Sequence, residues 1–180
     1  MNKIIAIVGM CGSGKSVASE LLESIGYKRV YFGGVTMDKL KEKGLEVTPE
    51  NEKMMREKLR EDLGMGAFAT ILLPKIKELA ETNDVVLDGL YSWDEYKILN
   101  DEFGKQLITI GIICDKKIRY NRLKIREVRP LTKKEAENRD LAEIENIAKA
   151  PPIAYADYYI FNNGTFKDYE KRLDEILKQI

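Results

Sequence analysis

The sequence predicts a doubly wound α/β fold, in which a parallel five-stranded sheet carries helices on both of its faces. Three observations predict it. Short apolar runs alternate with helix-length segments, the runs do not alternate apolar with polar residues, and a glycine-rich loop follows the first run. Strands that are buried on both faces of a parallel sheet read as continuous apolar runs. Helices between such runs indicate βαβ units with right-handed connections.

The length of the chain suits a single domain of this kind. The 180 residues are expected to form one domain over 1–180, with a small helical lid inserted around 119–139. A folded chain of this size buries roughly 70% of the surface that it would expose when unfolded. The domain therefore needs no disulfide or metal to hold its core together.

The predicted strands are the five apolar runs at residues 4–8, 29–32, 84–87, 107–114 and 158–161. The helices between them have marked starts. Three pairs have the spacing of a capping box: Ser92 and Glu95, Thr132 and Glu135, and Thr165 and Asp168. Thr48-Pro49 is typical of an N-cap followed by proline in the first turn. Pro74 is expected to kink or restart the apolar helix in which it lies.

The loop after the first run carries the strongest chemical signal. It fits the pattern G-x-x-x-x-G-K-[ST] with Gly9, Met10, Cys11, Gly12, Ser13, Gly14, Lys15 and Ser16. An apolar run precedes this phosphate-binding loop, or P-loop, and a helical stretch follows it, as the motif requires. Glycines let backbone N–H groups turn toward phosphate oxygens, and the helix presents its positive end to the same group. Lys15 is expected to reach the β- and γ-phosphates of ATP, and Ser16 to bind Mg²⁺.

Asp88 follows the third apolar run and precedes Gly89. The carboxyl ends of strands face the ligand crevice in a doubly wound sheet. A carboxylate at this place either holds Mg²⁺ or accepts a proton, and the sequence leaves both roles open. A turn or helix-capping aspartate is the simpler alternative.

A basic segment follows the fourth run. Its arginines are Arg119, Arg122, Arg126, Arg129 and, farther on, Arg139. The first four are three or four residues apart, so a helix would place them along one face. Guanidinium groups suit phosphate oxygens and the charge on a transferring phosphoryl group. After a P-loop, the segment is expected to form a lid with these arginines over the phosphates; a solvated basic face is the alternative.

Composition excludes several classes of function. Lys plus Arg equals Asp plus Glu at 30 each, so no net field attracts nucleic acid or an anionic membrane. The absence of histidine removes histidine-based triads, and two cysteines alone make a structural zinc site improbable. The apolar run near the N-terminus is too short to span a membrane. We expect a cytoplasmic protein without a disulfide.

The chain resembles the adenylate-kinase-related and dephospho-CoA-kinase-like P-loop proteins of archaea and some bacteria. The similar segments are the P-loop, Phe32-Gly33-Gly34-Val35, Lys43-Gly44-Leu45, Thr48 to Asn51, Arg60, Gly64-Met65, Leu87-Asp88-Gly89 and Ala156 to Ile160. The resemblance implies a P-loop NTPase fold, an ATP and Mg²⁺ site at Lys15 and Ser16, and lid arginines over the phosphates. The segment Asn162-Asn163-Gly164-Thr165 resembles the turn that contacts adenine in related kinases.

The chain departs from that family after the second run. Gly34 and Met37 stand where the pattern often has an aspartate and an arginine. Kinases of hydroxyl acceptors usually carry an aspartate there to orient or deprotonate the hydroxyl. A monophosphate needs no such base, because its second pKa is about 6. The departure therefore favours a nucleoside monophosphate as the acceptor.

The sequence thus predicts an ATP-dependent kinase of a small-molecule acceptor, acting as a monomer or homodimer. The catalytic candidates are Lys15, Asp88, Arg122 and Arg126, with Ser16 and Asp88 at the metal. Nucleotide binding is expected from the P-loop, Arg119, Asn163, Gly164 and Thr165, and acceptor binding from Gly33, Gly34, Arg56 and Arg60. Two alternatives remain: a kinase of a hydroxyl acceptor such as dephospho-CoA, and a nucleotide-sensing ATPase.

Overall fold

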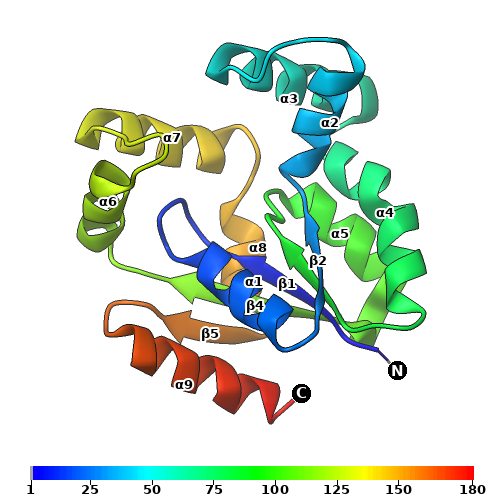
Figure 1. The fold of residues 1–180 in the computed structure, drawn as a ribbon, viewed down its shortest axis with the longest axis vertical. Coiled ribbons are helices and arrows are strands. Elements are labelled where there is room, and N and C mark those ends of the chain that lie inside the picture. Colours follow the sequence, from blue (N-terminus) through cyan, green and yellow to red (C-terminus); the bar gives the residue numbers. More distant parts are fainter. Residues whose placement is uncertain (1) are drawn as a thin grey trace.

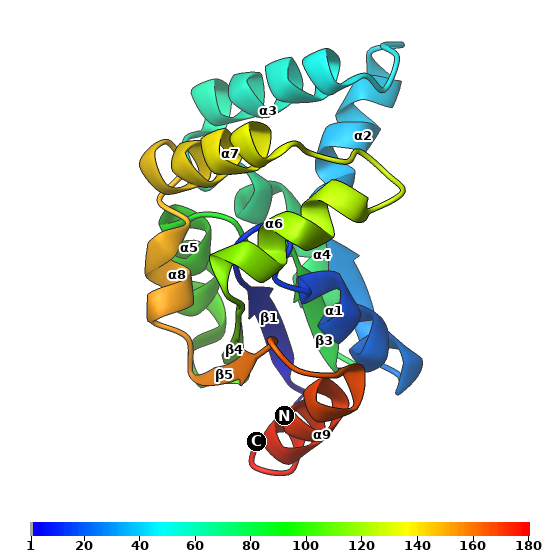
Figure 2. The ribbon, with the colours of Figure 1, turned by 90° about the vertical axis from the view of Figure 1, so that its left-hand side faces the viewer.

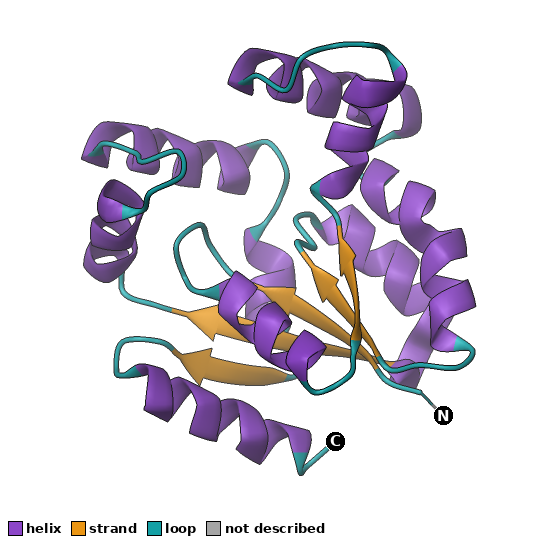
Figure 3. Ribbon diagram, viewed as in Figure 1, coloured by secondary structure: helices purple, strands orange, loops and turns teal. Residues whose placement is uncertain are grey.

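A five-stranded parallel sheet forms the centre of the molecule in the computed structural model, which describes residues 2–180. Its strands are β1 (Ile4–Val8), β2 (Lys28–Tyr31), β3 (Val85–Asp88), β4 (Leu107–Ile113) and β5 (Tyr158–Phe161). They lie in the order β2-β3-β1-β4-β5, and every pair is parallel (Figure 3). The predicted fold class is confirmed, and each predicted strand lies within one residue of the observed one.

Helices cover both faces of the sheet (Figure 1). Successive residues of a strand point to opposite faces, and all five residues of the central strand β1 are buried. On one face Ile5 and Ile7 pack with α1 (Lys15–Ser24) and α9 (Phe166–Leu177). On the other face Ile4, Ala6 and Val8 pack with α4 (Ala67–Ala80), α5 (Trp93–Phe103) and α8 (Ala150–Ala154). The strand is therefore apolar at every position because it has no solvent-facing side.

The predicted helix starts are confirmed. Ser92, Thr132 and Thr165 each form a complete capping box at the start of α5, α7 (Lys133–Glu145) and α9. Thr48 caps α3 (Pro49–Leu63) by accepting the N–H of Asn51 at 3.2 Å. Pro74 lies inside α4, which continues from Ala67 to Ala80 as one helix. The proline therefore does not end the helix that contains it.

Two helical segments extend beyond the carboxyl ends of the strands (Figure 2). The first consists of α2 (Gly34–Glu42) and α3, and the second of α6 (Lys116–Ile125) and α7. They approach each other through Glu52 of α3, which accepts hydrogen bonds from Arg129 in the turn between α6 and α7. The crevice above the sheet is thus covered from two sides.

The basic segment does not form one continuous helix, which corrects the expectation from spacing. Arg119 and Arg122 lie on α6, but α6 ends at Ile125 and Arg126 is its C-cap. Arg129 has a φ of 54°, in the left-handed region that non-glycine residues rarely adopt. The four arginines therefore do not share one helical face, and their side chains take different partners.

No helix among residues 2–180 combines the length and the apolar character needed to cross a bilayer.

Candidate active site

The P-loop joins β1 to α1 and forms a cradle that only glycine can line at two places. Gly9 has a φ of 154°, and a Cβ there would lie 2.7 Å from the carbonyl oxygen of Ile112. Gly14 is the N-cap of α1 with a φ of 100°, and a Cβ there would collide with the side chain of Asn162. Ser13, buried at 1% exposure, has a hydroxyl without a partner among the described residues. The loop is thus shaped around an opening, which fits a bound phosphate chain.

Lys15 and Ser16 begin α1, where the helix presents unpaired N–H groups. The Lys15 ammonium donates to the carbonyl oxygen of Met10 at 3.1 Å, so it lies along the loop. Burial, together with the nearby charge of Lys149, lowers the pKa of Lys15 to about 7. Ser16 is exposed at the first turn of the helix. A bound phosphate would restore the charge on Lys15, because an adjacent anion favours the protonated amine.

Asp88 is the last residue of β3, and only 4% of it is exposed. Arg29 of β2 donates to its Oδ2 atom twice, from Nε at 3.1 Å and from Nη2 at 2.5 Å. Among the described residues nothing donates to Oδ1. Asp88 lines the cleft beside the P-loop, so its second oxygen is available to a ligand there.

That cleft has a volume of about 330 Å³ and contains far more positive than negative side chains. We call it the cationic cleft. Its lining residues are Cys11, Gly12, Gly14, Lys15, Ser16, Val17, Tyr31, Asp88, Tyr91, Arg122, Arg126, Arg139 and Lys149. Five of these are lysines or arginines, and Asp88 is the single carboxylate among them. An excess of positive side chains in a cleft favours anionic ligands.

Two of the cleft cations are held by a carboxylate outside it. Glu143 of α7 accepts from Arg139 Nε at 3.1 Å and from Lys149 Nζ at 2.7 Å. Lys149 is 1% exposed, and its ammonium lies 4.7 Å from the centroid of the Tyr91 ring. The two positive neighbours lower the pKa of Glu143 against the opposing effect of its burial. Sequence reasoning missed Lys149 and Tyr91, because no local pattern distinguishes them from surface residues.

The arginines on α6 and at its C-cap have different partners, and only some of them line the cleft. Arg119 is buried and pairs with Asp140 of α7, and it does not line the cleft. Arg122 lines the cleft and donates to the carbonyl oxygen of Asn162 at 3.1 Å. Arg126 lines it too and donates from Nε to the carbonyl oxygen of Arg129 at 2.6 Å. Arg122 and Arg126 thus border the cleft beside the P-loop, whereas Arg119 does not.

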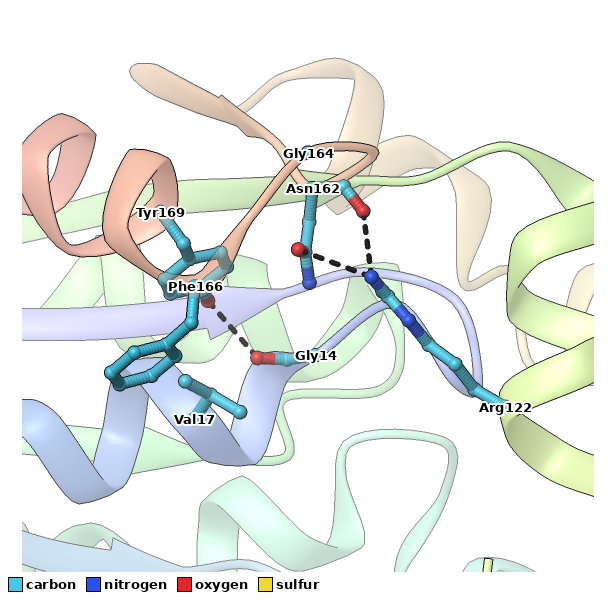
Figure 4. A pocket seen from close by; sticks show the side chains of 7 residues that line it. All are labelled: Gly14, Val17, Arg122, Asn162, Gly164, Phe166 and Tyr169. Atoms are coloured by element: carbon cyan, nitrogen blue, oxygen red, sulfur yellow. Dashed lines mark hydrogen bonds between the residues drawn. The ribbon is translucent and has the colours of Figure 1, made fainter. Parts of the chain in front are cut away.

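A second cavity, of about 240 Å³, shares Gly14, Val17 and Arg122 with the cationic cleft (Figure 4). Its lining residues are Gly14, Val17, Arg122, Asn162, Gly164, Phe166 and Tyr169. Figure 4 shows Tyr169 donating to the carbonyl oxygen of Gly14, at 3.0 Å, while Arg122 reaches across to Asn162. Burial raises the pKa of the Tyr169 hydroxyl, so it remains a donor. We call this the base pocket, since its apolar walls adjoin the P-loop.

The turn 162–165 contributes to the base pocket differently from the sequence expectation. Of Asn163, Gly164 and Thr165, Gly164 alone is among the lining residues. Asn163 accepts the N–H of Asp115 at 2.9 Å, and Thr165 is occupied as the N-cap of α9. Phe166, which the sequence analysis did not select, supplies an aromatic wall and is 57% exposed. The sequence feature that could have pointed to Phe166 is its position directly after Thr165, the N-cap of α9.

The residues predicted to hold the acceptor lie at the start of α2 and on α3. Gly33 is the N-cap of α2 and Gly34 its first residue, and the ring of Tyr31 packs against Gly33. Arg56 pairs with Glu52 at 3.3 Å. Arg60 lies over the ring of Phe68 at 5.1 Å, and burial lowers the pKa of its guanidinium. Neither arginine lines the cationic cleft in this conformation.

The oxygens beside the P-loop fit a magnesium ion bound mainly through phosphate and water. Residues 2–180 contain no cluster of three or more His, Cys, Asp or Glu side chains that could hold a metal. Mg²⁺ in nucleotide sites usually keeps several waters and takes one or two protein oxygens together with phosphate. The Ser16 hydroxyl and the Asp88 Oδ1 atom meet this requirement, and both residues line the same cleft.

A protein-family model described as "AAA domain" matches residues 5–145 of this chain. The match covers the P-loop, the α2–α3 segment and α6–α7. The P-loop core of this chain is therefore related to that family.

Similar archaeal proteins extend over nearly the whole chain. A UPF0200 protein of Thermococcus onnurineus is 34% identical over 98% of this chain and 97% of its own length. A UPF0200 protein of Aeropyrum pernix is 35% identical over 93% of this chain and 88% of its own length.

Solved structures share the fold at lower identity. A Thermus thermophilus protein superposes with a TM-score of 0.67 and 20% identity, covering 99% of this chain and 98% of its own. Shikimate kinase from Bacteroides thetaiotaomicron superposes with a TM-score of 0.62 and 15% identity, over 98% of this chain and 97% of its own. The chain therefore shares its fold with these two proteins.

Proposed function

We propose that this chain, which belongs to the UPF0200 family and contains an AAA domain, is an ATP-dependent kinase of a nucleoside monophosphate. The observation that carries the proposal is the excess of cations in the cleft beside the P-loop. Five lysine and arginine side chains line it against one carboxylate. A triphosphate alone would occupy Lys15 and the loop amides, so the remaining charges suit a second anionic group.

The two cavities support the assignment of ATP as the donor. They share Gly14, Val17 and Arg122, so a molecule that fills both must pass the start of α1. A base in the pocket and phosphates in the cleft describe a nucleoside triphosphate. The aromatic wall at Phe166 offers a stacking surface for the base.

The roles of the residues follow from the charges. The amides of the P-loop and the N-terminus of α1 bind the phosphates, and Lys15 neutralises them. Arg122 and Arg126 stabilise the charge on the transferring group, a task that is almost entirely electrostatic in phosphoryl transfer. Mg²⁺, held at Ser16 and Asp88, would neutralise the β- and γ-phosphate oxygens. The α6–α7 segment serves as a lid that excludes water.

A monophosphate acceptor suits the residues of the cationic cleft that lie outside the P-loop. Arg139 and Lys149 line the cleft together with Tyr31 and Tyr91, two cations and two aromatic rings. Such a combination suits the phosphate and base of a nucleotide. Arg56 and Arg60 would join them through an inward movement of α3, since closure of such segments completes the site in many transferases.

An ADP-release screen tests this function. The wild-type protein is assayed with ATP and Mg²⁺ against every common nucleoside monophosphate, shikimate and dephospho-CoA, and Lys15→Ala is the control. We expect one or more monophosphates to raise ADP release at least about tenfold above the acceptor-free rate, equivalent to 1.4 kcal/mol. If shikimate or dephospho-CoA stimulates ADP release and no monophosphate does, the result would favour a kinase of a hydroxyl acceptor. No stimulation by any acceptor would favour a nucleotide sensor.

A further inference from the structure

We propose that Arg29 is a positioning residue that commits Asp88 to Mg²⁺ and removes it from the role of general base. This inference rests on the proposed kinase function and decides between the two roles that the sequence left open for Asp88. It also narrows the range of possible acceptors, because a site without a carboxylate base suits an acceptor oxygen that is already ionised.

The strand register brings the two side chains together. In the parallel pair of β2 and β3, Arg29 lies opposite Val86 and Tyr31 lies opposite Asp88. Arg29 and Asp88 are therefore two positions apart along the sheet and point to the same face. From this place the guanidinium reaches Oδ2 with two N–H groups, at 3.1 and 2.5 Å.

A second carboxylate holds Arg29 from the other side. Glu23, near the end of α1, accepts from Nη1 at 3.4 Å. Its side chain is 53% exposed, whereas that of Asp88 is 5% exposed. The guanidinium thus bridges the P-loop helix and β3, and the pair with Asp88 is the more strongly desolvated of the two.

Arg29 is the permanent counter-charge of Asp88. Burial opposes the charge of Arg29, but the hydrogen bond and the charge of Asp88 raise its pKa above the ordinary value. A desolvated carboxylate without such a partner would favour the protonated form.

The pairing restricts what Asp88 can do during the reaction. To act as a base, the carboxylate would take up a proton while Oδ2 still accepts two charge-assisted hydrogen bonds. Protonation would weaken both bonds, since such bonds depend on the ionised acceptor. Offering Oδ1 to a Mg²⁺-bound water keeps the charge and both bonds. The proton of a hydroxyl acceptor would then have no carboxylate to receive it.

The experiment compares Arg29→Ala, Arg29→Lys and the matched control Glu23→Gln, which removes the other partner of the same guanidinium. Calorimetry measures ADP affinity with and without Mg²⁺. For Arg29→Ala we expect unchanged affinity for ADP alone and a loss of about tenfold in the enhancement by Mg²⁺. Arg29→Lys should retain only part of the enhancement, because its ammonium keeps the charge but does not reproduce the two donors of the guanidinium.

The outcomes separate this inference from the proposed function. Unchanged Mg²⁺ enhancement in Arg29→Ala would show that Arg29 only supports the fold. If Arg29→Ala does not fold, Arg29→Lys decides: a Mg²⁺ enhancement equal to that of wild type, despite the lost second donor to Oδ2, overturns the inference. Should no acceptor be found, the Mg²⁺–ADP measurement still tests Arg29. Turnover of a hydroxyl acceptor by the wild-type protein would contradict only the monophosphate assignment, because the Mg²⁺–ADP measurement on Arg29 does not depend on the acceptor.

Discussion

Arg119 and Asp140 form a bidentate ion pair that joins α6 to α7. Nη1 lies 3.0 Å from Oδ1 and Nη2 lies 2.6 Å from Oδ2, and both side chains are less than 10% exposed. The same Nη1 atom donates to the carbonyl oxygen of Cys11 in the P-loop at 2.9 Å. The guanidinium therefore connects the P-loop to α7. The terminal nitrogens of Arg119 thus donate to protein atoms, whereas Arg122 and Arg126 line the cleft.

Breaking this pair is expected to destabilise the protein. Arg119→Ala should lower the free energy of unfolding by about 3–5 kcal/mol, because it leaves Asp140 buried without a counter-charge. Urea unfolding followed by circular dichroism measures the change. Lys116→Ala is the control, since Lys116 pairs with Glu137 on the surface, and it should unfold like the wild type. Equal stability of Arg119→Ala and wild type would contradict the structural role of the pair.

Nucleotide binding is expected to depend on pH through Lys15. Its pKa is about 7 in the free protein, and bound phosphates raise it. Above pH 7 the complex therefore binds more protons than the free protein, so ATP affinity should fall as the pH rises. Calorimetry at pH 8.5 in two buffers of different ionisation enthalpy should detect proton uptake. Lys15→Arg, which stays charged, should bind without that uptake; equal uptake by this variant would assign the proton to another group.

Phe166 is expected to contribute to the binding of the base. Phe166→Ala should weaken ATP affinity by about 1–3 kcal/mol, the range found for stacking of a base on an aromatic side chain. Phe161→Ala is the matched control, because Phe161 is also exposed but lies outside the base pocket. Binding of a fluorescent ATP analogue measures both. ATP should also be preferred over GTP and CTP, and an equal effect of the two substitutions would place the base elsewhere.

Glu52 is expected to hold the lid against α3 before substrates bind. It accepts from Arg129 Nη1 at 3.0 Å and from Arg56 at 3.3 Å, and it is 4% exposed. Glu52→Gln should speed hydrogen exchange across residues 126–132, because the charge that retains Arg129 is lost. Glu57→Gln, which affects the exposed pair with Lys53, should leave the exchange unchanged.

Substrates should reverse that effect. We expect residues 119–139 to be the most mobile part of the free protein, and ATP with an acceptor to slow their exchange in both the wild type and Glu52→Gln. Bound phosphates would then replace Glu52 as the partner of the lid arginines. Exchange that is insensitive to both ligand and substitution would mean that the segment is a static basic face.

The sequence by itself determined the strands, the P-loop and the helix starts. Each of these leaves a signal within a few consecutive residues of the sequence. A strand such as residues 4–8 is apolar throughout because both faces are covered, and Gly9 and Gly14 permit backbone angles that other residues avoid. The capping boxes at Ser92, Thr132 and Thr165 close over three residues. Local chemistry therefore sufficed to predict the fold class and the phosphate loop.

Only the tertiary structure decided which charged side chains face a ligand. The spacing of the arginines suggested one common role, yet Arg119 is buried against Asp140 while Arg122 lines the cleft. Arg29 meets Asp88 across 59 positions of the chain, and Arg129 meets Glu52 across 77. A long charged side chain takes the partner that folding brings within reach, and its energy depends on how far both are removed from water. Neither the partner nor the burial can be derived from neighbouring residues in the sequence.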